Sequence, residues 1–269
     1  MGLSQVLAKY DVVLVDQYGV LHNGTQPMIG ALGAMGFSTD FQGVTAETWT
    51  TQHTRTLLGL AHDLGKLVSK TNLDSIFQSG REIVGLDKAQ FLVVEGVQQV
   101  CYSDCVAEAL ATDYRHTNTP NDAINEFLRG GCERKLPLLC PNSDAVGVVE
   151  NDRFVYMGGG IAKLYEEKGG EVVYFGKPTK EHFEVCLQLA NVTDKSKVVH
   201  IGDSLHHDIQ GATNVGVDSI LIAGGVHAKQ LEVDAWSDAE EDHHIKPELL
   251  DKLLGETELD PTYTRRFQW

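Results

Sequence analysis

Residues 198–222 read VVHIGDSLHHDIQGATNVGVDSILI, and this stretch decides the fold class. It opens with an apolar run, 198–201, that predicts a short strand ending just before the Gly-Asp pair 202–203. A helix is predicted over 205–215, and a second apolar strand over 217–222. Two such strands joined by a helix are typical of a βαβ unit, in which the strands are parallel and helices cover the sheet.

The rest of the chain extends this pattern toward the amino terminus. Residues 12–15, VVLV, form a continuous apolar run that stops at Asp16, which predicts a strand buried on both faces. Further strands are predicted over 89–94 and 136–140, and helices over 45–66, 121–128 and 158–167. We therefore expect an α/β fold built on a doubly wound parallel sheet.

Composition excludes several classes of protein. The chain has 269 residues and a formal net charge of −16, so its surface repels nucleic acid and anionic membranes, and we expect neither as a partner. No segment approaches the roughly 18 apolar residues of a spanning helix, and the first residues do not resemble a signal peptide. Five cysteines, without a CxxC pair, indicate reduced thiols. We expect a cytoplasmic protein, and whether it forms a homo-oligomer stays open.

Carboxylates stand at the ends of two predicted strands. Asp16 ends the first strand, Asp203 follows the strand 198–201, and Asp208 lies one helical turn further on. Ligands of parallel α/β sheets bind at the carboxyl ends of the strands. Three converging carboxylates suit a hard cation such as Mg²⁺, whereas any one of them alone could cap a helix or occupy a turn.

Four motifs resemble those of the haloacid dehalogenase (HAD) superfamily, subclass IIA. The first is DQYGVLHNG at 16–24, the third is GKP at 176–178, and the fourth is GDSLHHD at 202–208. Their order and spacing match the family pattern, and PNSD at 141–144 resembles the N-P-D element of subclass IIA cap domains.

This resemblance implies a phosphatase with a Mg²⁺ cofactor and a small phosphorylated metabolite as substrate. Asp16 would attack phosphorus and form an aspartyl phosphate. The metal ligands would be Asp16, the backbone carbonyl of Tyr18, Asp203 and Asp208. Lys177 would be a second catalytic residue, a cation placed against the phosphoryl oxygens.

The resemblance also implies two domains. A HAD-like core would comprise residues 1–66 and 158–269, and a mixed α/β cap domain would be inserted at 67–157. Within the cap, Asn142 and Asp144 would face the substrate; the alternative is that they form an Asx turn.

Two features depart from the family pattern. Phosphatases of this superfamily have a second aspartate two residues after the nucleophile, but this chain has Tyr18, and losing a general acid typically costs roughly 10²- to 10⁴-fold in rate. The alternatives are a catalytically impaired metabolite-binding protein and a dehalogenase, because true haloacid dehalogenases have a D-x-Y-G pattern like Asp16–Gly19.

The second departure is a missing segment. The span from Pro27 to Gly36 is too short for the helix and strand that normally carry the second motif, because a helical crossover alone needs about a dozen residues. We therefore expect the core sheet to lack the strand next to 12–15, together with the Ser or Thr that would bind the phosphoryl group.

Overall fold

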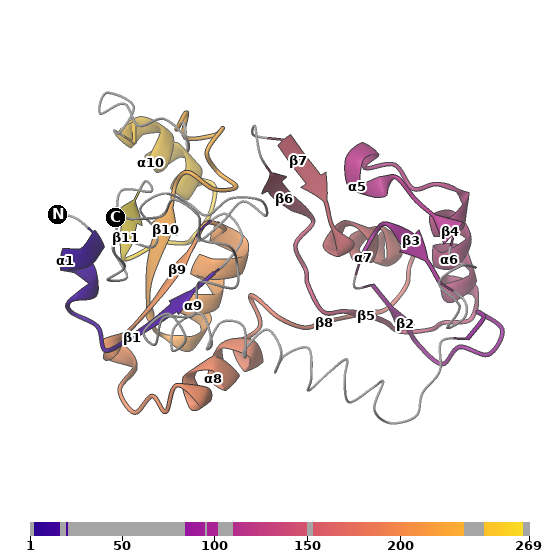
Figure 1. The fold of residues 1–269 in the computed structure, drawn as a ribbon, viewed down its shortest axis with the longest axis horizontal. Coiled ribbons are helices and arrows are strands. Elements are labelled where there is room, and N and C mark those ends of the chain that lie inside the picture. The colour runs from indigo at the N-terminus through magenta and orange to yellow at the C-terminus, as the bar shows by residue number, and fades with distance from the viewer. Residues whose placement is uncertain are drawn as a thin grey trace, which may run out of the picture. The chain divides into compact units, whose positions relative to one another are not determined.

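The computed structural model describes residues 3–16, 20, 84–94, 96–101, 110–149, 153–233 and 245–265 (Figure 1). The chain divides into two compact units. Unit 1 comprises residues 1–65 and 178–269, and unit 2 comprises residues 66–177. Each unit has a hydrophobic core of its own.

A parallel sheet forms the centre of unit 1. Its described strands are β1 (Val12–Val15), β9 (Val198–Gly202), β10 (Asp218–Ile222) and β11 (Tyr263–Arg265), in the order β1-β9-β10-β11. All three pairings are parallel. The interior strand β9 is buried along its whole length, as its largely apolar sequence predicts. The strands predicted over 12–15, 198–201 and 217–222 are confirmed.

Helices cover both faces of this sheet. The helices of unit 1 are α1 (Leu3–Leu7), α8 (Lys180–Leu189), η3 (Lys195–Lys197), η4 (Leu205–Ile209), α9 (Gln210–Val215) and α10 (Pro247–Gly255). Phe183 of α8 and Ala212 of α9 pack with Val198 on one face. Val6 of α1 packs with Val199 on the other, so the sheet is doubly wound as predicted. The helix predicted over 205–215 begins as one π-helical turn, η4, before α9.

Unit 2 is a mixed α/β unit around a smaller parallel sheet. This sheet has the order β2-β5-β8, formed by β2 (Leu92–Val93), β5 (Leu138–Cys140) and β8 (Val172–Tyr174). Two antiparallel pairs accompany it: β3 (Gln99–Val100) with β4 (Leu110–Ala111), and β6 (Val146–Val149) with β7 (Arg153–Tyr156). The helices are α5 (Tyr114–Thr117), α6 (Asp122–Glu133) and α7 (Gly158–Glu167).

The boundary of unit 2 differs from that expected for the cap. The sequence places the return to the core at residue 158, whereas α7 and β8 belong to unit 2. The physical reason is pairing and packing, because β8 forms a parallel pair with β5 and Tyr165 of α7 is buried in the unit 2 core. The Tyr165 hydroxyl also donates a hydrogen bond to the Leu136 carbonyl at 2.7 Å.

Several expectations lie outside the described residues. They are the helix over 45–66, the segment around Pro27–Gly36 with its missing strand, and Tyr18. Among the described strands, β1 pairs with β9.

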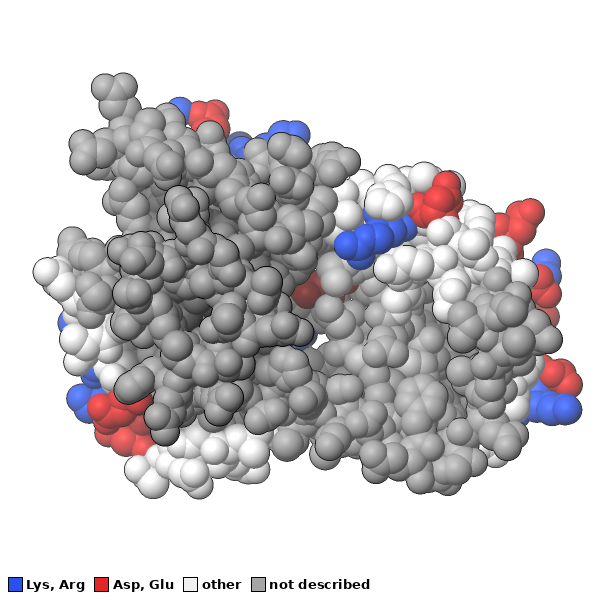
Figure 2. All heavy atoms as spheres, in the orientation of Figure 1, with Lys and Arg blue, Asp and Glu red and all other residues white. Residues whose placement is uncertain are grey.

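Among the described residues, no helix is both long and apolar enough to cross a bilayer. Acidic and basic side chains occur next to each other on the described part of the face in Figure 2. Cys101, Cys132, Cys140 and Cys186 are free thiols, and the last two are buried.

Candidate functional site

The carboxyl ends of β1 and β9 bring two aspartates to the same edge of the unit 1 sheet. Asp16 directly follows β1, and Asp203 directly follows β9. The two strands are adjacent and parallel, with Val15 opposite Ile201. The Asp16 N–H donates to the Ile201 carbonyl at 2.8 Å, which continues the ladder past the end of β1. The backbone itself therefore fixes the position of Asp16.

Asp208 reaches the same edge through the π-helical turn η4. The turn begins after Ser204, whose side chain caps it by accepting the His207 N–H at 3.2 Å. Asp208 is fully buried against the end of β9. A Cβ at Gly202 would lie 2.1 Å from Asp208 Cγ, so only glycine allows this carboxyl group to approach the strand end.

Asp203 is held by a second glycine-containing loop. Its Oδ2 accepts the Val226 N–H at 2.9 Å, and its side chain is buried. A Cβ at Gly225 would lie 2.1 Å from the same oxygen. The loop after β10 thus closes over Asp203, and its glycine leaves room for the carboxylate.

Together, the three side chains form a carboxylate cluster. One carboxylate oxygen each from Asp16, Asp203 and Asp208 lies within 4.8 Å of the others. Negative charges this close in a partly buried site repel one another, and a divalent cation removes that repulsion. Carboxylate oxygens are the ligands that Mg²⁺ prefers, so this donor set fits the metal.

His200 is a site residue that none of the sequence motifs indicates. It lies on β9, and its Nε2 is 2.9 Å from Asp208 Oδ1. Since a carboxylate only accepts hydrogen bonds, Nε2 carries the proton. Nδ1 has no hydrogen-bond partner among the described residues, a buried arrangement that costs about 1–3 kcal/mol. The signal in the sequence was a polar residue inside the otherwise apolar run VVHIG.

A second histidine supports the start of η4. His227 Nε2 accepts the Leu205 N–H at 3.3 Å, while Nδ1 is 2.6 Å from Gln230 Oε1. Burial lowers the pKa of His227 below its ordinary value of 6.5. The neutral imidazole is the form that can accept from Leu205.

The other predicted site residues lie in unit 2, at the carboxyl ends of β5 and β8. Because these strands are parallel neighbours, residues 141–144 and Lys177 follow strand ends at one edge of their sheet. Ser143 Oγ donates to the Lys177 carbonyl at 2.7 Å and so ties the two loops together.

Residues Asn142 and Asp144 form the Asx turn that the sequence left as the alternative to substrate contact. Asn142 Oδ1 accepts the Asp144 N–H at 3.0 Å. The Asp144 carbonyl in turn accepts the Gly159 N–H at 3.0 Å, at the first turn of α7. The Asx turn explains the conformation of this loop. Contact of the two side chains with substrate stays a proposal.

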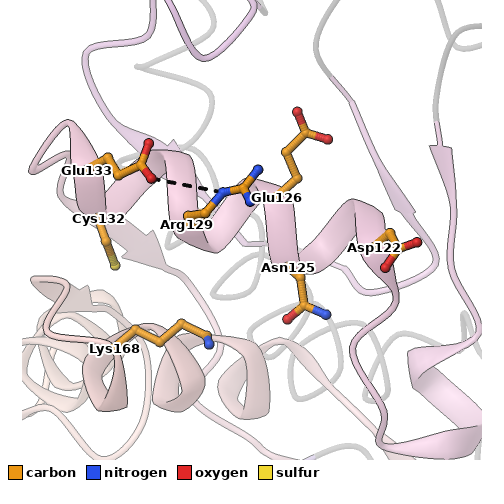
Figure 3. Close-up of a pocket in the computed structure, with 7 residues that line it drawn as sticks. All are labelled: Asp122, Asn125, Glu126, Arg129, Cys132, Glu133 and Lys168. Atoms are coloured by element: carbon orange, nitrogen blue, oxygen red, sulfur yellow. Dashed lines mark ion pairs between the residues drawn. The ribbon is translucent and has the colours of Figure 1, made fainter.

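Unit 2 also contains a pocket of about 610 Å³ beside α6. It is lined by Asp122, Asn125, Glu126, Arg129, Cys132, Glu133 and Lys168 (Figure 3). Arg129 Nε is 4.0 Å from Glu133 Oε1, and both side chains are 70% exposed. None of the predicted site residues lines this pocket, and its exposed mixed charges are unlike the largely apolar walls of typical ligand sites.

One family model matches part of the chain. Residues 174–252 match the HAD-hydrolase-like family, a segment that contains Lys177, Asp203 and Asp208. None of the curated proteins matches the chain.

Solved structures resemble the chain over most of its length. A haloacid dehalogenase-like hydrolase from Brucella suis is 25% identical, with a TM-score of 0.59 over 85% of this chain and 94% of its own. A possible sugar phosphatase from Cytophaga hutchinsonii is 15% identical, with a TM-score of 0.62 over 98% and 96%. A p-nitrophenyl phosphatase from Archaeoglobus fulgidus is 16% identical, with a TM-score of 0.57 over 96% and 97%. Residues 174–252 are therefore similar to the HAD-hydrolase-like family, and the chain as a whole shares the fold of these hydrolase and phosphatase structures.

Proposed function

We propose that this chain is a Mg²⁺-dependent phosphatase that hydrolyses a small phosphorylated metabolite through an aspartyl phosphate on Asp16. The observation that carries the proposal is the cluster of Asp16, Asp203 and Asp208 carboxylates at one sheet edge. The Cytophaga and Archaeoglobus proteins, described as a possible sugar phosphatase and a p-nitrophenyl phosphatase, share the fold and support the reaction type.

The carboxylate cluster supports the metal dependence of the proposed reaction. Asp16, Asp203 and Asp208 would hold the Mg²⁺ ion, together with the Tyr18 carbonyl that the family resemblance implies. The bound ion would supply charge neutralisation for the carboxylates and the phosphate. The Asp203 and Asp208 carboxylates already accept backbone N–H groups at 2.9 and 3.0 Å, so little reorganisation is needed.

Asp16 is the residue that would do the covalent chemistry. One of its carboxylate oxygens bonds to phosphorus while the bond from phosphorus to the ester oxygen breaks, and the leaving oxygen takes up a proton from water. Water then attacks phosphorus, which restores Asp16 and releases inorganic phosphate. For Lys177 we propose the role that the family resemblance implies, a cation against the phosphoryl oxygens.

Tyr18 favours a second candidate, a metabolite-binding protein with little turnover. A phenol is a poor substitute for the carboxylate that protonates the leaving group in related phosphatases. A dehalogenase is a third candidate, which the D-x-Y-G pattern alone supports.

We place the protein in the cytoplasm because its described cysteines are free thiols.

A panel assay separates these candidates. We expect the full chain to release phosphate slowly from some small phosphate esters, sugar phosphates and p-nitrophenyl phosphate included, only with Mg²⁺ present. Asp16→Asn should abolish the release, because the amide is not a nucleophile. Binding of esters without turnover would favour the metabolite-binding protein, and halide release from a haloacid without Mg²⁺ would favour the dehalogenase.

A further inference from the structure

We propose that His200 is a positioning residue of the metal site, which acts by holding the Asp208 carboxylate in its ligating orientation. The inference rests on the proposed function, since it concerns the same cation site. It assigns a role to a residue that lies on the central strand and outside every motif of the site.

The contacts of Asp208 show how the positioning works. Its Oδ1 is 2.9 Å from His200 Nε2, and its Oδ2 accepts the Ser204 N–H at 3.0 Å. Two donors, one on each oxygen, fix the rotation of a carboxyl group, which one donor alone would leave free. Ser204 contributes a backbone donor that any residue at that position would supply, whereas the donor from His200 depends on the identity of its side chain.

Packing alone does not explain why a histidine occupies position 200. The residue is 4% exposed, and its partners across the sheet are Leu14 on β1 and Ser219 on β10. The Phe183 ring packs edge-on against the imidazole, with centroids 5.0 Å apart. Nδ1 has no hydrogen-bond partner among the described residues. An apolar side chain would fill this space without burying a polar nitrogen, so the histidine is explained by its contact with Asp208.

Titration of MgCl₂ into the full chain, followed by calorimetry, tests the proposal with a matched pair of variants. His200→Gln keeps an N–H donor near the position of Nε2, whereas His200→Leu removes it. We expect His200→Leu to weaken the Mg²⁺ Kd by about 10- to 100-fold, and His200→Gln to stay within about threefold of the parent. The melting temperature in EDTA reports any general loss of packing.

A double-mutant cycle asks whether the effect passes through Asp208. In the Asp208→Asn background, adding His200→Leu should change the Kd by less than about threefold. If His200→Leu does not fold, His200→Asn takes its place, because its shorter amide reaches the position of Nδ1 and not that of Nε2; it should lose affinity as His200→Leu would.

Three results would overturn the inference. The first is that His200→Leu binds Mg²⁺ as tightly as the parent. The second is that His200→Leu and His200→Gln lose the same amount of Mg²⁺ affinity. The third is that His200→Leu weakens the Mg²⁺ Kd as much in the Asp208→Asn background as in the parent. If the parent protein binds Mg²⁺, the proposed function is still supported in each of these three cases. A parent that binds no Mg²⁺ would overturn the inference and the metal dependence together.

Discussion

Gly225 decides how closely the loop after β10 can approach Asp203. An alanine there would put its Cβ 2.1 Å from Asp203 Oδ2, so the loop or the carboxylate must move. We expect Gly225→Ala to lower the free energy of unfolding by about 1–3 kcal/mol and to reduce the rise in melting temperature with Mg²⁺. Gly255→Ala is the control, because a Cβ at that position would meet no neighbouring atom within 4 Å outside its own helix backbone. Equal behaviour of the two variants in thermal melts would contradict this account of the site.

The residue at position 18 sets the expected rate. Tyr18 stands where related phosphatases have the carboxylate that protonates the leaving group, and that catalysis typically contributes roughly 10²- to 10⁴-fold. We expect Tyr18→Asp to raise kcat for a phosphate ester with a poor leaving group, provided that the phosphoryl group is bound. Fast turnover by the parent, abolished by Asp16→Asn, would show that no carboxylate is needed at position 18.

Strands with apolar runs and helices with a clear helical pattern could be predicted from the sequence. The short strands and turns could not. The strands β1 and β9 and the helix α7 follow directly from VVLV, VVHIG and the Gly-rich start at residue 158. The helix α6 runs five residues past its predicted end at 128, because Gly130 and Gly131 pack against Leu86 and Tyr165 and do not end the helix.

The site was predictable in part for the same reason. Parallel strands end at one edge, so the sequence could bring Asp16 and Asp203 together. The π-helical turn η4 has no sequence signature of its own, and His200 is one polar residue in an apolar strand. Their contribution, the orientation of Asp208, depends on tertiary contacts that periodicity does not encode.

The loops after β5 and β8 are coupled by the Ser143 hydroxyl. It donates to the Lys177 carbonyl at 2.7 Å, and a hydrogen bond of this kind contributes about 0.5–1.5 kcal/mol. We expect Ser143→Ala to raise KM or lower kcat for a phosphate ester while changing the melting temperature little. Ser196→Ala removes an exposed contact between a hydroxyl on η3 and the Asp194 carboxylate that caps this helix, and it should change neither kinetic parameter. Parental kinetics for Ser143→Ala would exclude coupling of the loops through this bond.

The start of η4 gives unit 1 a pH-dependent contribution to stability. Burial lowers the pKa of His227 in the folded protein, whereas the unfolded chain has an ordinary value of 6.5. As the pH falls through 6.5, the unfolded chain therefore binds a proton that the folded protein does not, and stability is lost. We expect His227→Gln to lose less stability than the parent between pH 7.5 and pH 5.5 in denaturant titrations. Parallel curves for the two proteins would contradict this contribution.

At the scale of the whole molecule, the chain ends of unit 1 meet at its sheet. The strand β11 pairs with β10, and the Ser219 N–H donates to Thr262 Oγ1 at 3.1 Å. Lys9, which follows α1, donates to the Tyr263 hydroxyl at 3.0 Å. The last described strand thus covers an edge of the sheet that would otherwise present unpaired backbone groups.

Ending the chain after Pro261 tests how much this closure contributes. The truncation removes β11 and exposes the β10 edge, where Ile220, Leu221 and Ile222 are fully buried in the intact protein. We expect the free energy of unfolding to fall by at least about 2 kcal/mol, since burying one such side chain contributes about 1.5–3 kcal/mol. Light scattering should also show association, because an uncovered edge strand pairs readily with another copy. Lys9→Met keeps β11 and loses only the surface contact, so its loss should stay below about 1 kcal/mol. A truncated chain that stays monomeric with the parental melting temperature would mean that the β10 edge needs no cover.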